Sequence, residues 1–158
     1  MKYRLSTTAV SEADRAEKIA NPGFGKYYTD HMVICEWNEA TGWAEPELMP
    51  YGPLSLDPAT AVFHYGQEIF EGMKAYRQPD GGLALFRPDA NAIRFARSAN
   101  RLALPEMPID LFIQTVEELV KTDAGWVPGK IGEALYIRPF MIATEVGLGV
   151  RPTNKATY

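Results

Sequence analysis

A tetrapeptide of turn-forming residues, Pro79-Asp80-Gly81-Gly82, separates two apolar segments of this 158-residue chain. Proline presets one φ angle of a turn and glycine accepts a positive φ, so residues 72–77 and 83–87 are predicted to form a β-hairpin. A hairpin makes its two strands antiparallel, and no part of the chain repeats strand–helix–strand units. The sequence therefore predicts an α+β domain with a largely antiparallel sheet and flanking helices.

Apolar periodicity and breaker residues predict the remaining elements. The expected elements are a strand at 31–38, an extended segment after residues 42–43, a short helix at 60–70, a helix at 88–102, a helix that begins at residue 109 and closes at 123–125, and a buried strand at 134–143. The helix that begins at residue 109 follows the i, i+3, i+4, i+7 template closely, whereas Pro139 implies that the last strand has an edge or a bulge.

The two ends of the chain differ from its middle. Residues 1–21 are polar and are expected to form a flexible lead-in, with Ser11 capping a short helix that reaches Ala20. Residues 22–158 then form the domain. No helix or polar tail follows Pro152, so the chain is expected to stop at a domain boundary.

Charge and cysteine content exclude several classes of protein. There are 16 Lys and Arg against 20 Asp and Glu, without long blocks of either sign, so neither nucleic acid nor a membrane surface is an expected partner. Cys35 is the single cysteine and only His31 and His64 accompany it, so no structural metal site is expected. Without a signal-peptide core or an 18-residue apolar window, we expect a cytoplasmic protein.

Basic and aromatic side chains are the candidates for a binding site. Arg94 can hold a phosphate through paired N–H groups, but on spacing alone a surface arginine that covers apolar area is the more common case. Tyr136 and Arg138 are two residues apart in an expected strand, so they share one face and can meet a carboxylate together. A cross-strand surface pair is again the more common arrangement.

Two further segments have a plain structural interpretation. His64 has no serine, cysteine or carboxylate at a recognisable spacing, so a structural role is favoured, and its neighbours Tyr65 and Phe70 would ordinarily be core. The segment Gly147-Leu148-Gly149-Val150 lacks the context of a phosphate loop, and it is expected to be a mobile loop carrying two exposed aliphatic side chains.

Several joint motifs resemble branched-chain amino-acid aminotransferases, which are fold type IV pyridoxal phosphate enzymes. The motifs are His64-Tyr65-Gly66-Gln67-Glu68-Ile69-Phe70-Glu71-Gly72-Met73-Lys74-Ala75-Tyr76, the segment from Phe86 to Leu102, Trp126-Val127-Pro128, Tyr136-Ile137-Arg138-Pro139 and Gly147-Leu148-Gly149-Val150. The resemblance covers roughly residues 22–152. It implies a small N-terminal domain that covers a cofactor held mainly by a larger C-terminal domain.

The resemblance also implies roles for individual residues. Arg94 matches the arginine on the cofactor phosphate. The substrate pocket is matched by Phe70, Tyr65, Tyr136, Arg138 and, more loosely, Phe24, while Leu148 and Val150 match a loop donated to the pocket of the neighbouring subunit of a homodimer. The lysine that forms the Schiff base in this family lies in the C-terminal domain, beyond Tyr158. This chain therefore holds no catalytic residue by this comparison, and alone it is expected to be inactive.

The implied reaction of the full-length protein is reversible amino transfer between leucine, isoleucine or valine and 2-oxoglutarate. Phe70, Tyr65, Leu148 and Val150 would enclose the branched side chain, and Arg138 with Tyr136 would accept the second carboxylate of 2-oxoglutarate. The alternatives are another fold type IV enzyme, acting on D-amino acids or a chorismate-derived substrate, a degenerate enzyme, or a non-catalytic association or binding module.

Overall fold

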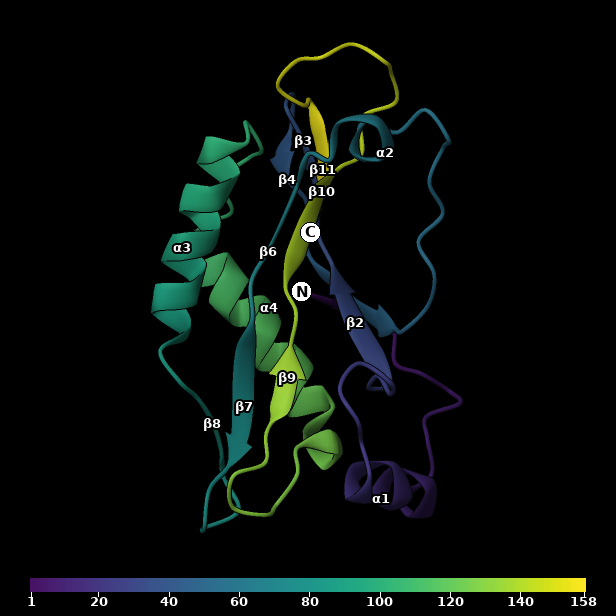
Figure 1. Ribbon diagram of the computed structural model, residues 1–158, viewed down its shortest axis with the longest axis vertical. Helices are drawn as coiled ribbons and strands as arrows, with labels where there is room; N and C mark the ends of the chain where they lie inside the picture. The colour runs from purple at the N-terminus through teal and green to yellow at the C-terminus, as the bar shows by residue number, and fades with distance from the viewer.

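The protein is described here by a computed structural model of residues 1–158, in which short strands form three small sheets (Figure 1). The first sheet has the order β1-β5-β2, the second β4-β3-β11-β10-β6, and the third β8-β7-β9. The strands are β1 (Lys2–Tyr3), β2 (His31–Ile34), β3 (Glu36–Asn38), β4 (Gly42–Trp43), β5 (Glu47–Pro50), β6 (Glu68–Phe70), β7 (Met73–Arg77), β8 (Leu83–Leu85), β9 (Leu135–Ile137), β10 (Phe140–Ala143) and β11 (Lys155–Thr157). All pairings except β1 with β5 are antiparallel, which confirms the predicted α+β class.

Four α-helices and one 3-10 helix complete the domain. They are α1 (Glu12–Ala20), α2 (Ala61–Tyr65), α3 (Pro88–Arg101), α4 (Ile109–Thr122) and η1 (Ala124–Trp126). Helices α3 and α4 pack on each other, α3 contacts β6, and α4 contacts β2 and β5 (Figure 1). Phe95 of α3, Phe112 of α4 and Tyr158 meet in the core, with ring centroids 5.3 to 6.0 Å apart. None of the helices combines the length and the apolar character needed to span a bilayer.

Two neighbouring runs of strand are interrupted side by side, one at residues 71–72 and the other at residues 138–139. This pair of interruptions, here called the paired break, positions the candidate site. Strand β6 gives way to β7 at Glu71 and Gly72, while β9 gives way to β10 at Arg138 and Pro139. The two runs stay side by side across the break (Figure 1), because the backbone N–H of Glu71 donates to the carbonyl of Pro139 at 2.8 Å.

Several predictions from the sequence are confirmed. The hairpin pairs β7 with β8, and the amide of Gln78 closes its turn on the carbonyl of Gly82 at 2.8 Å. Helices α3 and α4 lie where periodicity and Pro88 predict them. Ser11 caps α1, because its hydroxyl accepts a hydrogen bond from the amide of Asp14 at 3.2 Å.

Other predictions about the elements are wrong. The helix expected within residues 60–70 ends at Tyr65, because Gly66 adopts a left-handed φ of 57°, and the rest becomes β6. The single strands expected at 31–38 and 134–143 are each divided between two sheets, at Cys35 and at Pro139. The sequence predicts no element beyond Pro152, but residues 155–157 form β11 at the centre of the largest sheet.

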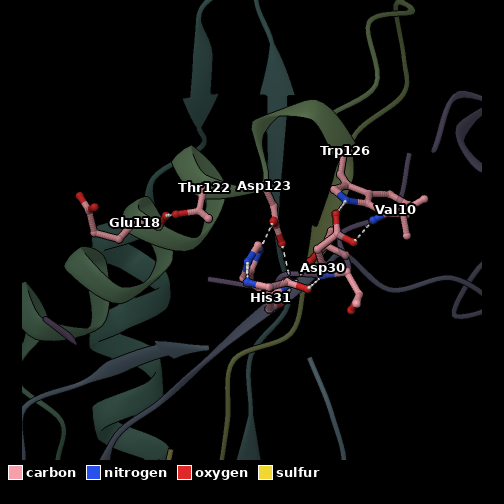
Figure 2. Close-up of polar contacts among 10 residues, drawn as sticks. Val10, Asp30, His31, Glu118, Thr122, Asp123 and Trp126 are labelled. Atoms are coloured by element: carbon pink, nitrogen blue, oxygen red, sulfur yellow. Dashed lines mark hydrogen bonds and ion pairs between the residues drawn. The ribbon is translucent and has the colours of Figure 1, made fainter. Parts of the chain in front are cut away.

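Polar contacts fasten the lead-in of residues 1–21 to the domain (Figure 2). The amide of Ser6 donates to His31 Nε2 at 2.9 Å, so the ring proton lies on Nδ1, which donates to Asp123 Oδ1 at 2.7 Å. Asp30 accepts from the amide of Val10 and from the indole of Trp126, both at 2.7 Å. The flexibility expected for this segment stays a prediction.

Candidate functional site

An arginine and a buried carboxylate meet at the paired break. Glu71, which is 4% exposed, accepts from Arg94 Nε and Nη2, each at 2.6 Å. Asn91, one turn before Arg94 on α3, donates to the same carboxylate at 2.9 Å and to the carbonyl of Gly72 at 3.2 Å. Helix α3 therefore presents its polar edge to the break, while the adjacent side, with Phe95, enters the core.

Glu71 and Arg94 each stabilise the charged form of the other. Burial acts to raise the pKa of the Glu71 carboxyl, but the hydrogen bonds from Arg94 and Asn91 outweigh it and hold the pKa below its usual value. The same hydrogen bond and the charge of Glu71 raise the pKa of Arg94. The carboxylate is therefore ionised at neutral pH and keeps the guanidinium in place.

A second cluster, here called the aromatic wall, consists of Phe24, Phe70, Tyr136 and Arg138. The guanidinium carbon of Arg138 lies 4.3 Å from the ring centroid of Phe70, and its Nε donates to the hydroxyl of Tyr136 at 3.0 Å. Phe24 meets Tyr136 edge to face at 5.3 Å. Phe70 is 62% exposed and Phe24 80% exposed. Tyr65 is exposed as well, so the interpretation of Phe70 and Tyr65 as core residues is wrong.

Gly72 allows the aromatic wall to approach the backbone. A Cβ atom at residue 72 would lie 2.7 Å from the hydroxyl oxygen of Tyr136, which is closer than such atoms can approach. The ring of Tyr136 therefore occupies the place of a side chain at this position.

Tyr65 is not part of the aromatic wall. It contacts the loop formed by residues 147–152, here called the 147–152 loop. The hydroxyl of Tyr65 donates to the carbonyl of Leu148, and Arg151 is paired with Glu145. Glu145 is buried and also accepts from the amide of Asn154 at 3.0 Å. Leu148 and Val150 are exposed, at 64% and 85%, so they do not fold back into the core of their own domain.

The residues at the break fit a phosphate group. Glu71 uses Arg94 Nε and Nη2, and no hydrogen bond within the chain uses Nη1. The side chain of Arg94 is 62% exposed, so the Nη1 and Nη2 edge is accessible. Two parallel N–H groups of that kind match the oxygens of a phosphate.

The sequence identified most of these residues but missed some of their neighbours. It indicated both members of the Arg138–Tyr136 pair and the aliphatic tip of the loop. It did not single out Glu71, Gly72 or Asn91, or Phe140, which lies opposite Phe70 across the β6–β10 pair and is also exposed. The pairing of Phe140 could have been found only from the register of strands that are distant in sequence.

Comparison with known proteins gives a consistent result. No protein-family model matches the chain. The probable branched-chain-amino-acid aminotransferase of Streptomyces coelicolor is 58% identical over 159 residues, covering 100% of this chain and 44% of that protein. The branched-chain-amino-acid aminotransferase of Mycolicibacterium smegmatis is 54% identical over 154 residues, covering 97% of this chain and 42% of that protein.

Solved structures share the fold. The crystal structure of the branched-chain aminotransferase from the thermophilic archaeon Thermoproteus uzoniensis, with norvaline, matches with a TM-score of 0.58 and 22% identity. The match covers 80% of this chain and 39% of that one. The chain thus spans less than half the length of the curated relatives it matches, and it corresponds to their N-terminal part. By its sequence, the chain is similar over its whole length to the N-terminal part of branched-chain-amino-acid aminotransferases.

Proposed function

We propose that the full-length protein transfers the amino group between leucine, isoleucine or valine and 2-oxoglutarate, using pyridoxal 5'-phosphate. The observation that carries the proposal is the 58% identity to a probable branched-chain-amino-acid aminotransferase over the whole of this chain. Within this activity, the chain supplies the substrate side of the pocket, and the proposed setting is a cytoplasmic homodimer.

The aromatic wall is proposed to bind the substrate side chain. Phe24, Phe70 and Tyr136 offer apolar surface that a branched aliphatic group can cover. Arg138 and the Tyr136 hydroxyl would bind the distal carboxylate of glutamate or 2-oxoglutarate. The stacking of Arg138 on Phe70 supports this role, because it holds the charge beside the apolar surface without an internal carboxylate partner.

Arg94 is proposed to bind the cofactor phosphate, and most of the cofactor would be held by the C-terminal part of the full-length protein. When bound, pyridoxal phosphate supplies the electron sink that this reaction requires. The residues of this chain would bind the cofactor phosphate, orient the substrate and enclose it. Arg94 anchors the phosphate with the edge that Glu71 leaves free, and the apolar rings exclude water from the substrate.

The 147–152 loop is proposed to close the pocket of the neighbouring subunit with Leu148 and Val150. Both side chains are exposed, and the Tyr65 hydroxyl and the Glu145–Arg151 pair tether the loop to the domain. Tyr65 is proposed to contribute to a pocket together with this loop.

A substrate survey of the full-length protein tests the proposed activity. With pyridoxal phosphate and 2-oxoglutarate present, L-leucine, L-isoleucine and L-valine should each yield glutamate, whereas D-alanine should not. Formation of D-glutamate from D-alanine would indicate a D-amino-acid transaminase. Breakdown of a chorismate-derived amine would indicate a lyase, and the absence of all these reactions would favour a non-catalytic module.

A further inference from the structure

Glu71 lies at the site without forming part of the pocket wall. Its carboxylate is buried, while the arginine that it binds is exposed. We propose that Glu71 is a positioning residue for the cofactor phosphate: it fixes one edge of the Arg94 guanidinium so that the other edge is presented to the phosphate. This inference rests on the proposed function of Arg94.

The atoms used in the pair are the basis of the proposal. A guanidinium has two edges at which two N–H groups run parallel, one formed by Nε and Nη2 and the other by Nη1 and Nη2. Glu71 occupies the first edge, with both contacts at 2.6 Å. Three N–H groups remain, and two of them form the second edge. Arg94 can therefore bind a carboxylate and a phosphate at once.

Glu71 is itself held firmly in place. Asn91 donates to Oε2 at 2.9 Å, the amide of Gly72 donates to the same atom at 3.3 Å, and the backbone N–H of Glu71 donates to Pro139. Glu71 thus connects α3, through its carboxylate, to the neighbouring strand run at Pro139, through its backbone N–H. An arginine fixed by such a support loses little side-chain freedom when it binds a ligand, whereas a free arginine must be ordered at that moment.

A carboxylate near a phosphate also has an opposing effect, because the two negative charges repel each other. If repulsion outweighed the gain from a fixed arginine, removing the charge of Glu71 would strengthen phosphate binding. The proposal states that the positioning effect is the larger one, so the two effects predict opposite signs and can be separated.

The experiment compares pyridoxal phosphate with pyridoxal, which lacks the phosphate group. The full-length protein is stripped of cofactor and titrated with each compound, and the absorbance of the bound form gives both dissociation constants. Their ratio isolates the phosphate contribution, and a loss of structure elsewhere would weaken both compounds alike. The variants are Glu71→Gln, Arg94→Ala and, as a control at another buried carboxylate with a basic partner, Asp123→Asn.

We expect Arg94→Ala to reduce the preference for pyridoxal phosphate by at least about tenfold, since it removes a charge-assisted contact. Glu71→Gln should reduce the preference by about fivefold, which corresponds to the ordering of one long side chain. Asp123→Asn should leave the ratio unchanged. If Glu71→Gln does not fold, Asn91→Ala removes one support of the carboxylate and should shift the ratio in the same direction.

The outcomes distinguish this inference from the proposed function. A reduced preference in Arg94→Ala, with an unchanged or increased preference in Glu71→Gln, would overturn the positioning role while leaving Arg94 as the phosphate ligand. An unchanged Asn91→Ala, where Glu71→Gln cannot be made, would overturn it equally. An unaffected Arg94→Ala would overturn both.

Discussion

At the scale of single residues, the hydroxyl of Tyr136 occupies the space that a side chain at residue 72 would need. Gly72 has an ordinary backbone conformation, so an alanine there would conflict with the neighbouring ring and not with φ. The atom in the way is the far end of a side chain that is only half-buried, so the ring can move at little cost to the fold. Its hydrogen bond with Arg138 then has to move with it.

Gly72→Ala is therefore expected to affect binding more than stability. In the full-length protein, the KM for 2-oxoglutarate should rise by about tenfold, because the pair proposed to bind the distal carboxylate is displaced. The melting temperature should change little. Gly52→Ala is the matched control, since a Cβ there meets no atom within 4 Å. Equal KM values for both variants would show that the position of Tyr136 does not matter for this substrate.

Arg138 permits a second prediction, which concerns the choice between substrates. Arg138→Gln keeps a polar side chain but removes the charge beside Phe70. The value of kcat/KM should fall by about 10- to 100-fold for 2-oxoglutarate, which carries the distal carboxylate, and by much less for leucine. Steady-state kinetics with both substrates measures this, and equal losses would exclude a carboxylate-binding role for Arg138.

At the scale of elements, the helices and the hairpin follow from local patterns, while β11 does not. Residues 155–157 carry no alternating apolar pattern, and their partners in β3 are far away in sequence: Thr157 Oγ1 donates to Glu36 Oε2 at 2.8 Å across 121 positions. The same limit applies to the site. The sequence indicates Arg94, but no pattern shows that Glu71 will be brought to it, because the paired break forms only when distant strands align.

The end of β11 leads to a prediction about alkaline pH. Tyr158 is partly buried against the core, and its hydroxyl lies 2.8 Å from the hydroxyl of Thr115, which itself donates to the carbonyl of Phe112. Burial raises the pKa of Tyr158 far above its usual value. The folded protein therefore keeps the phenol neutral, while the unfolded chain releases the proton near pH 10. The free energy of unfolding must then fall as the pH rises above about 10.

Tyr158→Phe should remove this part of the pH dependence. At pH 8 the variant should be destabilised by about 1 kcal/mol through the lost hydrogen bond. Between pH 8 and 10.5 its melting temperature should fall less than that of the wild type. Burial raises the pKa of Cys35 to about 11, but that contribution is present in both proteins. Tyr51→Phe, at an exposed ring, is the control, and identical pH profiles for Tyr158→Phe and wild type would contradict the prediction.

At the scale of the whole molecule, the exposed tip of the 147–152 loop is the feature on which the proposed homodimer can be tested. Two aliphatic side chains in water gain about 1.5–3 kcal/mol each when fully buried, so a pocket that accepts them would be stabilised measurably. If the loop acts in a homodimer, each active site should depend on the loop of the other subunit.

A mixed dimer of full-length subunits tests this dependence. One subunit carries Leu148→Ala and Val150→Ala, and the other lacks the lysine that binds the cofactor. The single competent site then receives a wild-type loop from its partner, so its affinity for leucine should stay near normal. Weakened affinity, equal to that of the loop variant alone, would assign the loop to the pocket of its own subunit.

The central place of β11 also governs the order of events during synthesis. Strands β3 and β4 leave the ribosome early and β6 and β10 later, but only β11 joins these two halves of the sheet. Until its last residues emerge, the backbone edges of β3 and β10 have no partner and are open to contacts with other chains. The nascent domain therefore depends on β11 to close the sheet, and a pause in synthesis after β10 has left the ribosome but before residues 155–157 have left it would keep both edges open.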